Sequence, residues 1–300
     1  MEKTHSFKSW LIATRPWSFP ASVMPVVVTI AYMFYVQGSS VDWVAGVWAA
    51  FAIVAFHAAG NTWSDYHDFK KGVDQAADNV GGTSLTSGEF RPAEILRLSI
   101  GLIAVAIVFG ILIVIYRGVP ILYFGIAGLV LTLLYPVMKY NALGDVDIFL
   151  TYSLLPILAT TYVVGGALYF PALWLTLPLG LITVAILHIN NLRDMESDRS
   201  AGIRTLAMLA GRRRAAYMYC VEIFLPFVWI VGMVALGELP LWSLIVLLAT
   251  VPALKAAKKA LRSREEGKSV VVGLDERTAQ LQLVFSLLLT VSFLVGGVVK

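Results

Sequence analysis

Cysteine and charged residues are scarce in this sequence. A single cysteine, Cys220, lies in an apolar run, which excludes a disulfide framework within one chain and a cluster of thiolate metal ligands. Asp, Glu, Lys and Arg make up only 14% of the 300 residues, whereas 58% are hydrophobic and the mean hydropathy is +0.78. This composition indicates that the lipid bilayer is the solvent of the protein.

The sequence also lacks the features of a cleaved leader and of a transmembrane barrel. Its first residues, M-E-K-T-H-S-F-K-S-W, contain no short apolar core followed by a small-residue cleavage site, so we expect the first span to direct insertion. Apolar runs of helix-spanning length replace the short alternating segments of a barrel. The sequence therefore predicts an all-α, polytopic membrane protein with a single transmembrane domain over residues 1–300.

Apolar runs bounded by polar residues, Gly or Pro predict about nine transmembrane helices. The first run is short, so we expect Trp10 to Phe19 to lie at the membrane interface beside it. The predicted spans are Ala21–Val36, Val44–Asn61, Leu98–Tyr116, Ile121–Met138, Ile148–Phe170, Leu173–Asn191, Ala216–Leu236, Leu241–Ala257 and Ala279–Val299.

Basic residues are distributed unevenly between the two sides of these spans. All of the 23 Lys and Arg residues except Arg117 and Lys300 fall on the side of the N-terminus. Because Lys and Arg mark cytoplasmic loops, we expect a cytoplasmic N-terminus and an external C-terminus, in a cell membrane of the bacterial inner-membrane type. The net charge of +4 then belongs to a face that meets anionic headgroups and substrate, and no nucleic acid partner is expected.

Two acidic stretches end two of the apolar helices on this cytoplasmic side. In N-T-W-S-D-Y-H-D-F-K-K-G-V-D, residues 61–74, Asn61, Asp65 and Asp68 share one helix face within about 60°. The stretch H-I-N-N-L-R-D-M-E-S-D, residues 188–198, repeats the pattern with Asn190, Asn191, Asp194 and Asp198. Their placement suggests a repeated four-helix unit, 1–140 and 141–260, followed by a final helix.

Carboxylates in this arrangement suit a hard cation. Mg²⁺ takes one or two carboxylates and fills its other positions with water and phosphate oxygens, so two facing clusters predict a diphosphate bridged to the protein by Mg²⁺. The predicted ligands are Asp65, Asp68, Asp194 and Asp198. Basic residues on the same side that can hold the remaining anionic charge are Lys70, Lys71, Lys139, Arg193 and Arg204.

Two other interpretations of the acids are open at this point. They can be ordinary solvated helix ends, although the matching phase, side and preceding Asn of the two motifs argue against this. They can also mark the cation pathway of a transporter, which would place carboxylates near mid-membrane on broken helices. Among the aromatic residues, Tyr135 lies near a cytoplasmic helix end and is predicted to stabilise a carbocation through its ring.

The motifs resemble the UbiA superfamily of intramembrane prenyltransferases, whose paired motifs are written N-x-x-x-D-x-x-x-D and D-x-x-x-D. Within it the chain looks most similar to the menaquinone branch, the 1,4-dihydroxy-2-naphthoate polyprenyltransferases, and the hydrophobic pattern extends the likeness to nearly the whole chain. The stretches that carry the resemblance are R-P-W-S-F-P-A-S-V-M-P (15–25), D-Y-H-D-F-K-K-G-V-D (65–74), L-G-D (143–145) and N-N-L-R-D-M-E-S-D-R-S-A-G-I-R-T-L-A (190–207).

The resemblance implies a fold, a reaction and substrate contacts. It implies nine helices around a central apolar cavity, Mg²⁺ as cofactor, a polyprenyl diphosphate as donor and an aromatic acceptor. In the menaquinone branch the acceptor is 1,4-dihydroxy-2-naphthoate, which loses its carboxyl group to give demethylmenaquinone. The alternative acceptors are 4-hydroxybenzoate, homogentisate and a glycerol-phosphate lipid. Substrate contacts are implied for Asn61, Asp74, Asn190 and Asn191 in addition to the basic residues and Tyr135.

The chain departs from the family pattern at four positions. The spacing from Asp65 to Asp68 is one residue shorter than the general motif, and Gly72 stands where a third Asp is expected, with Asp74 two residues on. The menaquinone branch displaces its last acid in a similar way. Ser64 replaces a frequent Asn, and Ile203 replaces a Lys before Arg204, which makes Arg204 the candidate to compensate for the missing cation.

Overall fold

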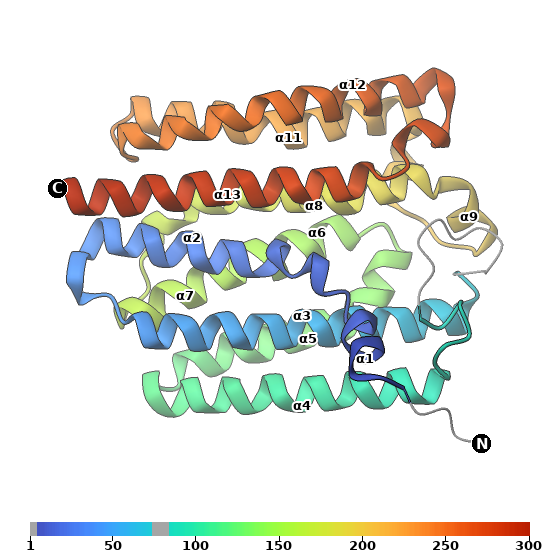
Figure 1. Ribbon diagram of the computed structural model, residues 1–300, viewed down its shortest axis with the longest axis horizontal. Coiled ribbons are helices and arrows are strands. Elements are labelled where there is room, and N and C mark those ends of the chain that lie inside the picture. Colours follow the sequence, from blue (N-terminus) through green and yellow to red (C-terminus); the bar gives the residue numbers. More distant parts are fainter. Residues whose placement is uncertain (1–4, 74–83) are drawn as a thin grey trace.

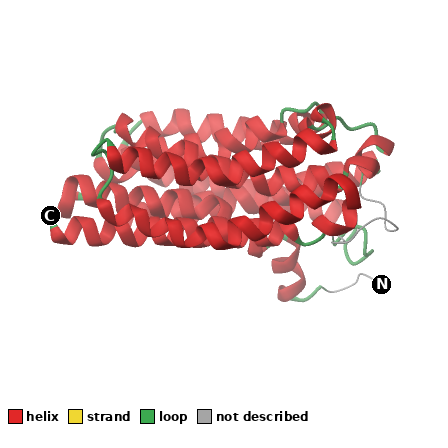
Figure 2. Ribbon diagram, turned by 90° about the horizontal axis from the view of Figure 1, so that it is seen from above, coloured by secondary structure: helices red, strands yellow, loops and turns green. Residues whose placement is uncertain are grey.

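The structure of the protein, a computed structural model, describes residues 5–73 and 84–300. Throughout these two ranges the regular elements are helices, and no strand is formed (Figure 2). Nine helical segments of the described chain are long and apolar enough to cross a membrane. The prediction of an all-α protein with nine spans is therefore confirmed.

The spanning segments are built from α-helices with short 3₁₀ or π segments at several of their ends. In chain order the elements are α1 (Phe7–Ala13), η1 (Pro16–Ser18), α2 (Pro20–Gln37), η2 (Gly38–Ser40), α3 (Trp43–Lys71), α4 (Pro92–Arg117), α5 (Pro120–Tyr140), α6 (Gly144–Phe149), η3 (Leu150–Leu154), α7 (Leu155–Gly165), η4 (Phe170–Leu175), α8 (Thr176–Arg193), α9 (Met195–Ser200), α10 (Leu206–Ala210), α11 (Arg212–Ala235), η5 (Leu241–Ala249), α12 (Thr250–Glu266), η6 (Lys268–Val271) and α13 (Leu274–Val299).

The long helices run side by side along the long axis of the molecule, and the two ends of the chain lie at opposite ends of the bundle (Figure 1). Helix α8, which carries the second acidic motif, is the most enclosed, with 67% of its apolar stretch buried. The corresponding share for α4 and α5 is 17%, and their exposed side chains are large and apolar. These two helices therefore present an apolar surface suited to lipid.

Several boundaries differ from the predicted ones. The N-terminal interface segment forms a separate helix, α1, because Arg15 adopts a left-handed conformation (φ 55°) immediately before Pro16. Helix α3 continues well past the predicted end at Asn61 and stops at Lys71, where Gly72 (φ 74°) caps it. The first acidic motif thus lies on a continuous helix.

The opposite end of the bundle holds a small polar cluster around Asp42. Asp42 caps α3 by accepting a hydrogen bond from the Ala45 N–H at 2.9 Å, which holds the pKa of its carboxyl below the ordinary value. Its other oxygen accepts hydrogen bonds from the Tyr116 hydroxyl at 2.8 Å and from Arg117 at 2.5 Å. Arg117, one of the two basic residues assigned to this side, is thus neutralised locally.

The fifth span contains a five-residue π-helix, η3, that packs against α8 at Gly180. A Cβ atom added at Gly180 would lie 2.5 Å from a ring carbon of Phe149 and 3.1 Å from Cβ of Ser153. Small residues allow such close approach between membrane helices. Gly180 therefore sets how near the central helix comes to η3.

We expect Gly180→Ala to destabilise the protein by about 1–3 kcal/mol, since the added methyl must displace Phe149 or separate the two helices. The measurement is the thermal unfolding midpoint of the purified protein in detergent. Gly101→Ala is the matched control, because Gly101 lies within α4 with no atom within 4 Å of the added carbon. An unchanged midpoint for Gly180→Ala would contradict this account of the packing.

Candidate active site

The first acidic motif lies on the inner face of α3, as its spacing predicts. Asp65 and Asp68 are 5% and 4% exposed, so both carboxylates are buried. Asn61, one turn earlier, donates hydrogen bonds from Nδ2 to the Thr14 carbonyl at 3.0 Å and to Ser18 Oγ at 3.1 Å. Asn61 therefore fixes the segment between α1 and α2 against the motif.

Asp68 is held by three donors from two helices. The Lys139 ammonium lies 2.7 Å from Oδ2 and the Tyr140 hydroxyl donates to Oδ1 at 2.7 Å, both from the end of α5. Ser64 Oγ, on α3 itself, donates to Oδ2 at 3.2 Å. Lys139, predicted as a contact for diphosphate, thus lies directly beside a predicted metal ligand.

Asp65 is paired with a residue that the spacing arguments did not single out. The Arg15 guanidinium lies 2.5 Å from Asp65 Oδ1. The carbonyl of Arg15 accepts hydrogen bonds from the N–H and the hydroxyl of Ser18, which stabilise the bend between α1 and α2. Arg15 begins one of the stretches that carry the family resemblance, but nothing in its sequence distance from α3 indicates the pairing.

The second motif spans the break between α8 and α9. Asp194 stands at the junction with its carboxylate 39% exposed, whereas Asp198 is buried in α9. Arg193 donates hydrogen bonds to the Asp194 carboxylate from Nε at 2.8 Å and from Nη2 at 2.7 Å. Its Nη1 donates to Asp275 of α13 at 3.1 Å. The guanidinium predicted to contact diphosphate is therefore shared between two carboxylates here.

Main-chain hydrogen bonds join the segments that follow α5 and α9. Ala142 N–H donates to the Arg204 carbonyl at 2.7 Å, and Arg204 N–H donates to the Tyr140 carbonyl at 3.1 Å. Ile203, which replaces the expected lysine, is 2% exposed and faces inward, while Arg204 is exposed. The residues after the second motif thus lie beside the residue that binds Asp68.

The remaining predicted residues differ in their surroundings. Lys71 lies over the Tyr140 ring at 4.1 Å, close to the partners of Asp68, and Lys70 lies over the Tyr66 ring at 5.1 Å. Asn191 is buried at 6% exposure on α8. Asp74 lies outside the described residues.

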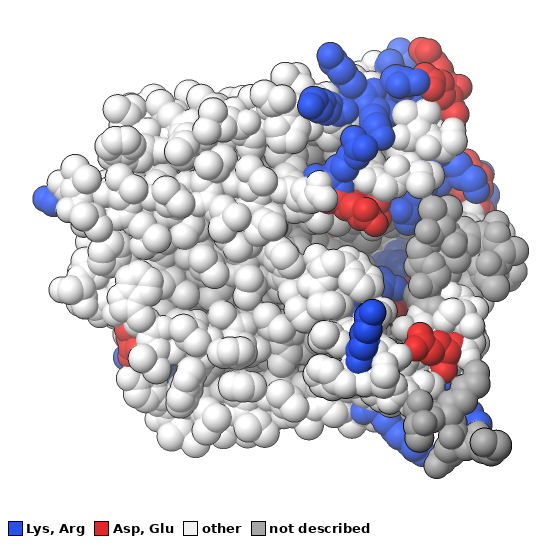
Figure 3. All heavy atoms as spheres, in the orientation of Figure 1, with Lys and Arg blue, Asp and Glu red and all other residues white. Residues whose placement is uncertain are grey.

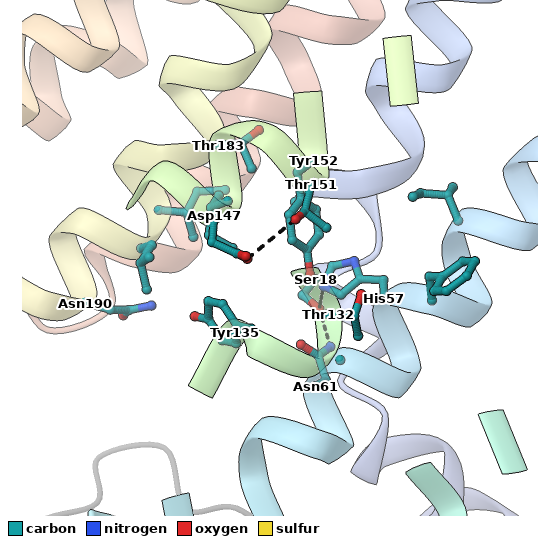
Figure 4. Close-up of a pocket in the computed structure, with 17 residues that line it drawn as sticks. Ser18, His57, Asn61, Thr132, Tyr135, Asp147, Thr151, Tyr152, Thr183 and Asn190 are labelled. Atoms are coloured by element: carbon teal, nitrogen blue, oxygen red, sulfur yellow. Dashed lines mark hydrogen bonds between the residues drawn. The ribbon is translucent and has the colours of Figure 1, made fainter. Parts of the chain in front are cut away.

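An open cavity lies between the two motif helices, and Figure 4 shows its lining. Asn61 and Asn190, each one turn before the first acid of its motif, both contribute to the wall. Tyr135 of α5 and Asp147 of α6 line it together with apolar side chains such as Phe56. The two motifs therefore flank one cavity, and Tyr135 is part of its wall.

A second, more apolar cavity shares part of this wall. Both cavities are lined by Phe56, Thr132 and Thr151, and the second extends between α3, α4, α5 and α7. Gly125 and Gly128 of α5 lie along it, with no atom within 4 Å of the position of an added Cβ. The cavity thus has room for an apolar chain.

Basic side chains gather at the end of the bundle that carries both motifs (Figure 3). Among the described residues, no group of three or more His, Cys, Asp or Glu side chains is arranged to hold a metal ion. The donor chemistry is that of separate carboxylates, which suits a hard cation whose other ligands come from water or phosphate.

Fold and site together define a polytopic helical membrane protein with an acidic and basic mouth above an apolar cavity. The model of the UbiA prenyltransferase family matches residues 23–272, and the chain belongs to this family. It is therefore a prenyltransferase, as the sequence predicted.

Similarity extends to characterised relatives and solved structures. The UbiA prenyltransferase domain-containing protein 1 of Xenopus tropicalis is 35% identical over 99% of this chain and 84% of its own length. The 1,4-dihydroxy-2-naphthoate octaprenyltransferase of Bacillus subtilis is 28% identical over 94% of this chain and 91% of its own length. A UbiA homologue from Archaeoglobus fulgidus bound to GPP and Mg²⁺ shares the fold, with a TM-score of 0.59, 12% identity, and coverage of 94% of this chain and 99% of that one. The special likeness to the naphthoate branch is not established, because the vertebrate protein is the more similar of the two relatives.

Proposed function

We propose that the protein transfers a polyprenyl group from a polyprenyl diphosphate to an aromatic acceptor with the help of Mg²⁺. The observation that carries the proposal is that Asn61 and Asn190, which precede the two acidic motifs, line one cavity. A diphosphate at the polar mouth would place its allylic carbon at the start of an apolar interior.

The carboxylates suit a divalent cation that is completed by the substrate. Asp65, Asp68, Asp194 and Asp198 would hold Mg²⁺, which when bound withdraws charge from the diphosphate as the C–O bond breaks. The structure of the Archaeoglobus fulgidus homologue bound to GPP and Mg²⁺ supports a role for this metal and for a prenyl diphosphate. Arg15 and Lys139, already beside Asp65 and Asp68, are within the same polar mouth and can neutralise phosphate oxygens.

We assign the other contacts of the diphosphate by where each residue lies relative to the polar mouth of the cavity. Lys71 lies at the same mouth over Tyr140, and we assign Lys70, Arg193 and Arg204 to its periphery. For Asp74, a contact with the diphosphate stays a prediction from the sequence. Asn61, Asn190 and Asn191 orient the two substrates, donor and acceptor, from the two motif helices. The Tyr135 ring lines the cavity, where its face can stabilise an allylic cation, and the apolar walls exclude water that would quench it.

The acceptor that we propose is 1,4-dihydroxy-2-naphthoate, which would give demethylmenaquinone. The relative from Bacillus subtilis, a 1,4-dihydroxy-2-naphthoate octaprenyltransferase, supports this choice over 94% of the chain. The L-G-D stretch at 143–145, which precedes the cavity residue Asp147, is part of the same resemblance.

The reaction is tested with membranes that contain the protein, Mg²⁺, a labelled polyprenyl diphosphate and a panel of aromatic acceptors. We expect prenylation of 1,4-dihydroxy-2-naphthoate that stops when the metal is chelated. Product from 4-hydroxybenzoate or homogentisate alone would overturn the acceptor, and activity that survives chelation would overturn the metal.

In the same assay, we expect Asp65→Asn and Asp194→Asn each to lower turnover by about 10²-fold or more. Each substitution removes a carboxylate that would hold Mg²⁺ against the leaving diphosphate. Asp42→Asn is the matched control: it lies at the opposite end of the bundle, and asparagine caps a helix as well as aspartate does. Full activity of either motif variant would contradict the assignment of that motif.

The isoprenoid tail would occupy the second, apolar cavity. This cavity adjoins the first through Phe56, Thr132 and Thr151, so a chain that begins at the diphosphate can continue into it. Gly125 and Gly128 leave open the space where a side chain would otherwise project.

We expect Gly128→Leu to shift donor preference toward shorter chains, because the new side chain fills part of the second cavity. The measurement is kcat/KM for a series of donors from geranyl diphosphate to polyprenyl diphosphates. Gly101→Leu, on α4 and outside both cavities, is the control and should leave the series unchanged. Unaltered preference in Gly128→Leu would place the tail elsewhere.

We further propose that the charged end of the bundle faces the cytoplasm of a bacterial-type cell membrane, since Lys and Arg gather there. Thiol labelling tests this with Cys220 replaced by serine. A membrane-impermeant maleimide added to intact cells should label Ser40→Cys, at the far end, and should spare Ser87→Cys, at the charged end. The reverse pattern would invert the topology.

A further inference from the structure

Asp147 is a buried acid of the cavity that belongs to neither acidic motif. It lies in the first turn of α6 and is 1% exposed. Figure 4 shows its carboxylate directed into the cavity between Tyr135 and Thr151. The prenyl transfer proposed above assigns no task to this residue.

The carboxylate of Asp147 is poorly satisfied by the protein. Thr151 Oγ1 donates to Oδ2 at 3.5 Å, the outer limit of a hydrogen bond, and Oδ1 has no hydrogen-bond partner among the described residues. Asp65 and Asp68, by contrast, each have a cation within 2.7 Å. Burying a carboxylate with one oxygen unpartnered and the other weakly bonded is costly, so its position in a substrate cavity points to a ligand that donates a hydrogen bond.

Among the described residues that line the cavity, Asp147 is the only acid. The other titratable residues that line it are Tyr135 of α5, Tyr152 of η3 and His57 of α3. His57 is held between Ser22 and Ser18, at 2.8 and 3.2 Å. On the far side, Asp145 faces His188 of α8 at 3.8 Å, and neither of these lines the cavity.

Asn190 supplies a second hydrogen-bond acceptor to the same space. Its Oδ1 is buried and has no hydrogen-bond partner among the described residues. Two acceptor groups, from α6 and α8, thus lie in one wall beside largely apolar surface. This chemistry suits a flat apolar ligand that bears hydroxyl groups.

We propose that Asp147 binds a ring hydroxyl of the aromatic acceptor and removes its proton as the ring attacks the prenyl carbon. The inference rests on the proposed prenyl transfer and adds the binding site of the acceptor. Asn190 accepts a hydrogen bond from the same ligand and acts as a positioning residue.

The step breaks one C–O bond and forms one C–C bond, and Asp147 holds the hydroxyl proton in between. The C–O bond to diphosphate breaks with its electron pair on the leaving oxygen, and a C–C bond forms between the prenyl carbon and a ring carbon conjugated with the hydroxyl. The hydroxyl proton passes to the Asp147 carboxylate, and the O–H pair forms a carbonyl. The substituted ring carbon then loses CO₂, or loses a proton to the released diphosphate, which returns electrons to the ring. The carboxyl group of Asp147 gives the oxygen its proton back.

The test is steady-state kinetics of the full-length protein with Mg²⁺, donor and acceptor. We expect Asp147→Asn to lower kcat/KM for the acceptor by about 10²–10⁴-fold, the usual contribution of a general base, with an unchanged KM for the polyprenyl diphosphate. The acidic limb of the wild-type pH profile should disappear in the variant, whose rate should instead rise with the acidity of the acceptor hydroxyl. Wild-type values for the acceptor in a folded Asp147→Asn protein would overturn the proposal.

The thermal stability of the variants distinguishes a role of Asp147 in catalysis from a role in holding the fold together. Removal of a buried charge that lacks a partner should leave the thermal midpoint of Asp147→Asn at or above that of the wild type. Asp145→Asn, two residues away on the same helix and outside the cavity wall, is the matched control and should keep the wild-type pH profile.

A second measurement needs no variant. The methyl ether of the acceptor keeps an electron-rich ring but has no proton for Asp147, so the wild-type protein should prenylate it at least about 10²-fold more slowly. Equal rates for ether and free hydroxyl would overturn the proposal. Failure of the wild type to prenylate any aromatic acceptor would refute the proposed function, whereas normal prenylation by Asp147→Asn would refute only the role of Asp147.

Discussion

The pairing of two buried carboxylates with two cations is the interaction on which the site depends. Asp65 and Asp68 are nearly inaccessible within a bundle of apolar helices, where an isolated charge is strongly disfavoured. Arg15 and Lys139 offset these charges from two different elements. The same contacts hold the segment after α1 and the end of α5 against α3, so they also determine the shape of the mouth of the cavity.

This arrangement places the two acids beside cations at one end of a largely apolar cavity. Tyr140 and Ser64 complete the hydrogen bonds of Asp68, which leaves that carboxylate in one orientation. A substrate diphosphate with its metal would enter a region where positive and negative groups already alternate. Because the acids and their cations already balance in charge, an isolated anion or metal ion would leave an uncompensated charge, whereas a diphosphate bound with its metal adds less net charge.

The period of the α-helix and the asymmetry of basic residues made much of this architecture predictable. The spans and the inward face shared by Asn61, Asp65 and Asp68 follow from apolar length and sequence spacing. The Arg15–Asp65 contact and the Arg193–Asp275 contact join residues far apart in the chain, so only tertiary structure reveals them. The sequence also does not single out Asp147, since an acidic residue in the first turn of a helix is ordinarily explained by its favourable interaction with the helix dipole.

The main-chain bonds between Tyr140, Ala142 and Arg204 have a consequence for sequence variation. They tie the end of α5, which binds Asp68, to the segment that follows Asp198, and they use no side-chain atom. The side chains of Ala142 and Arg204 can therefore change without breaking these bonds. Ile203, which directly precedes Arg204, contributes no side-chain atom to the connection, and its side chain is left to pack in the interior.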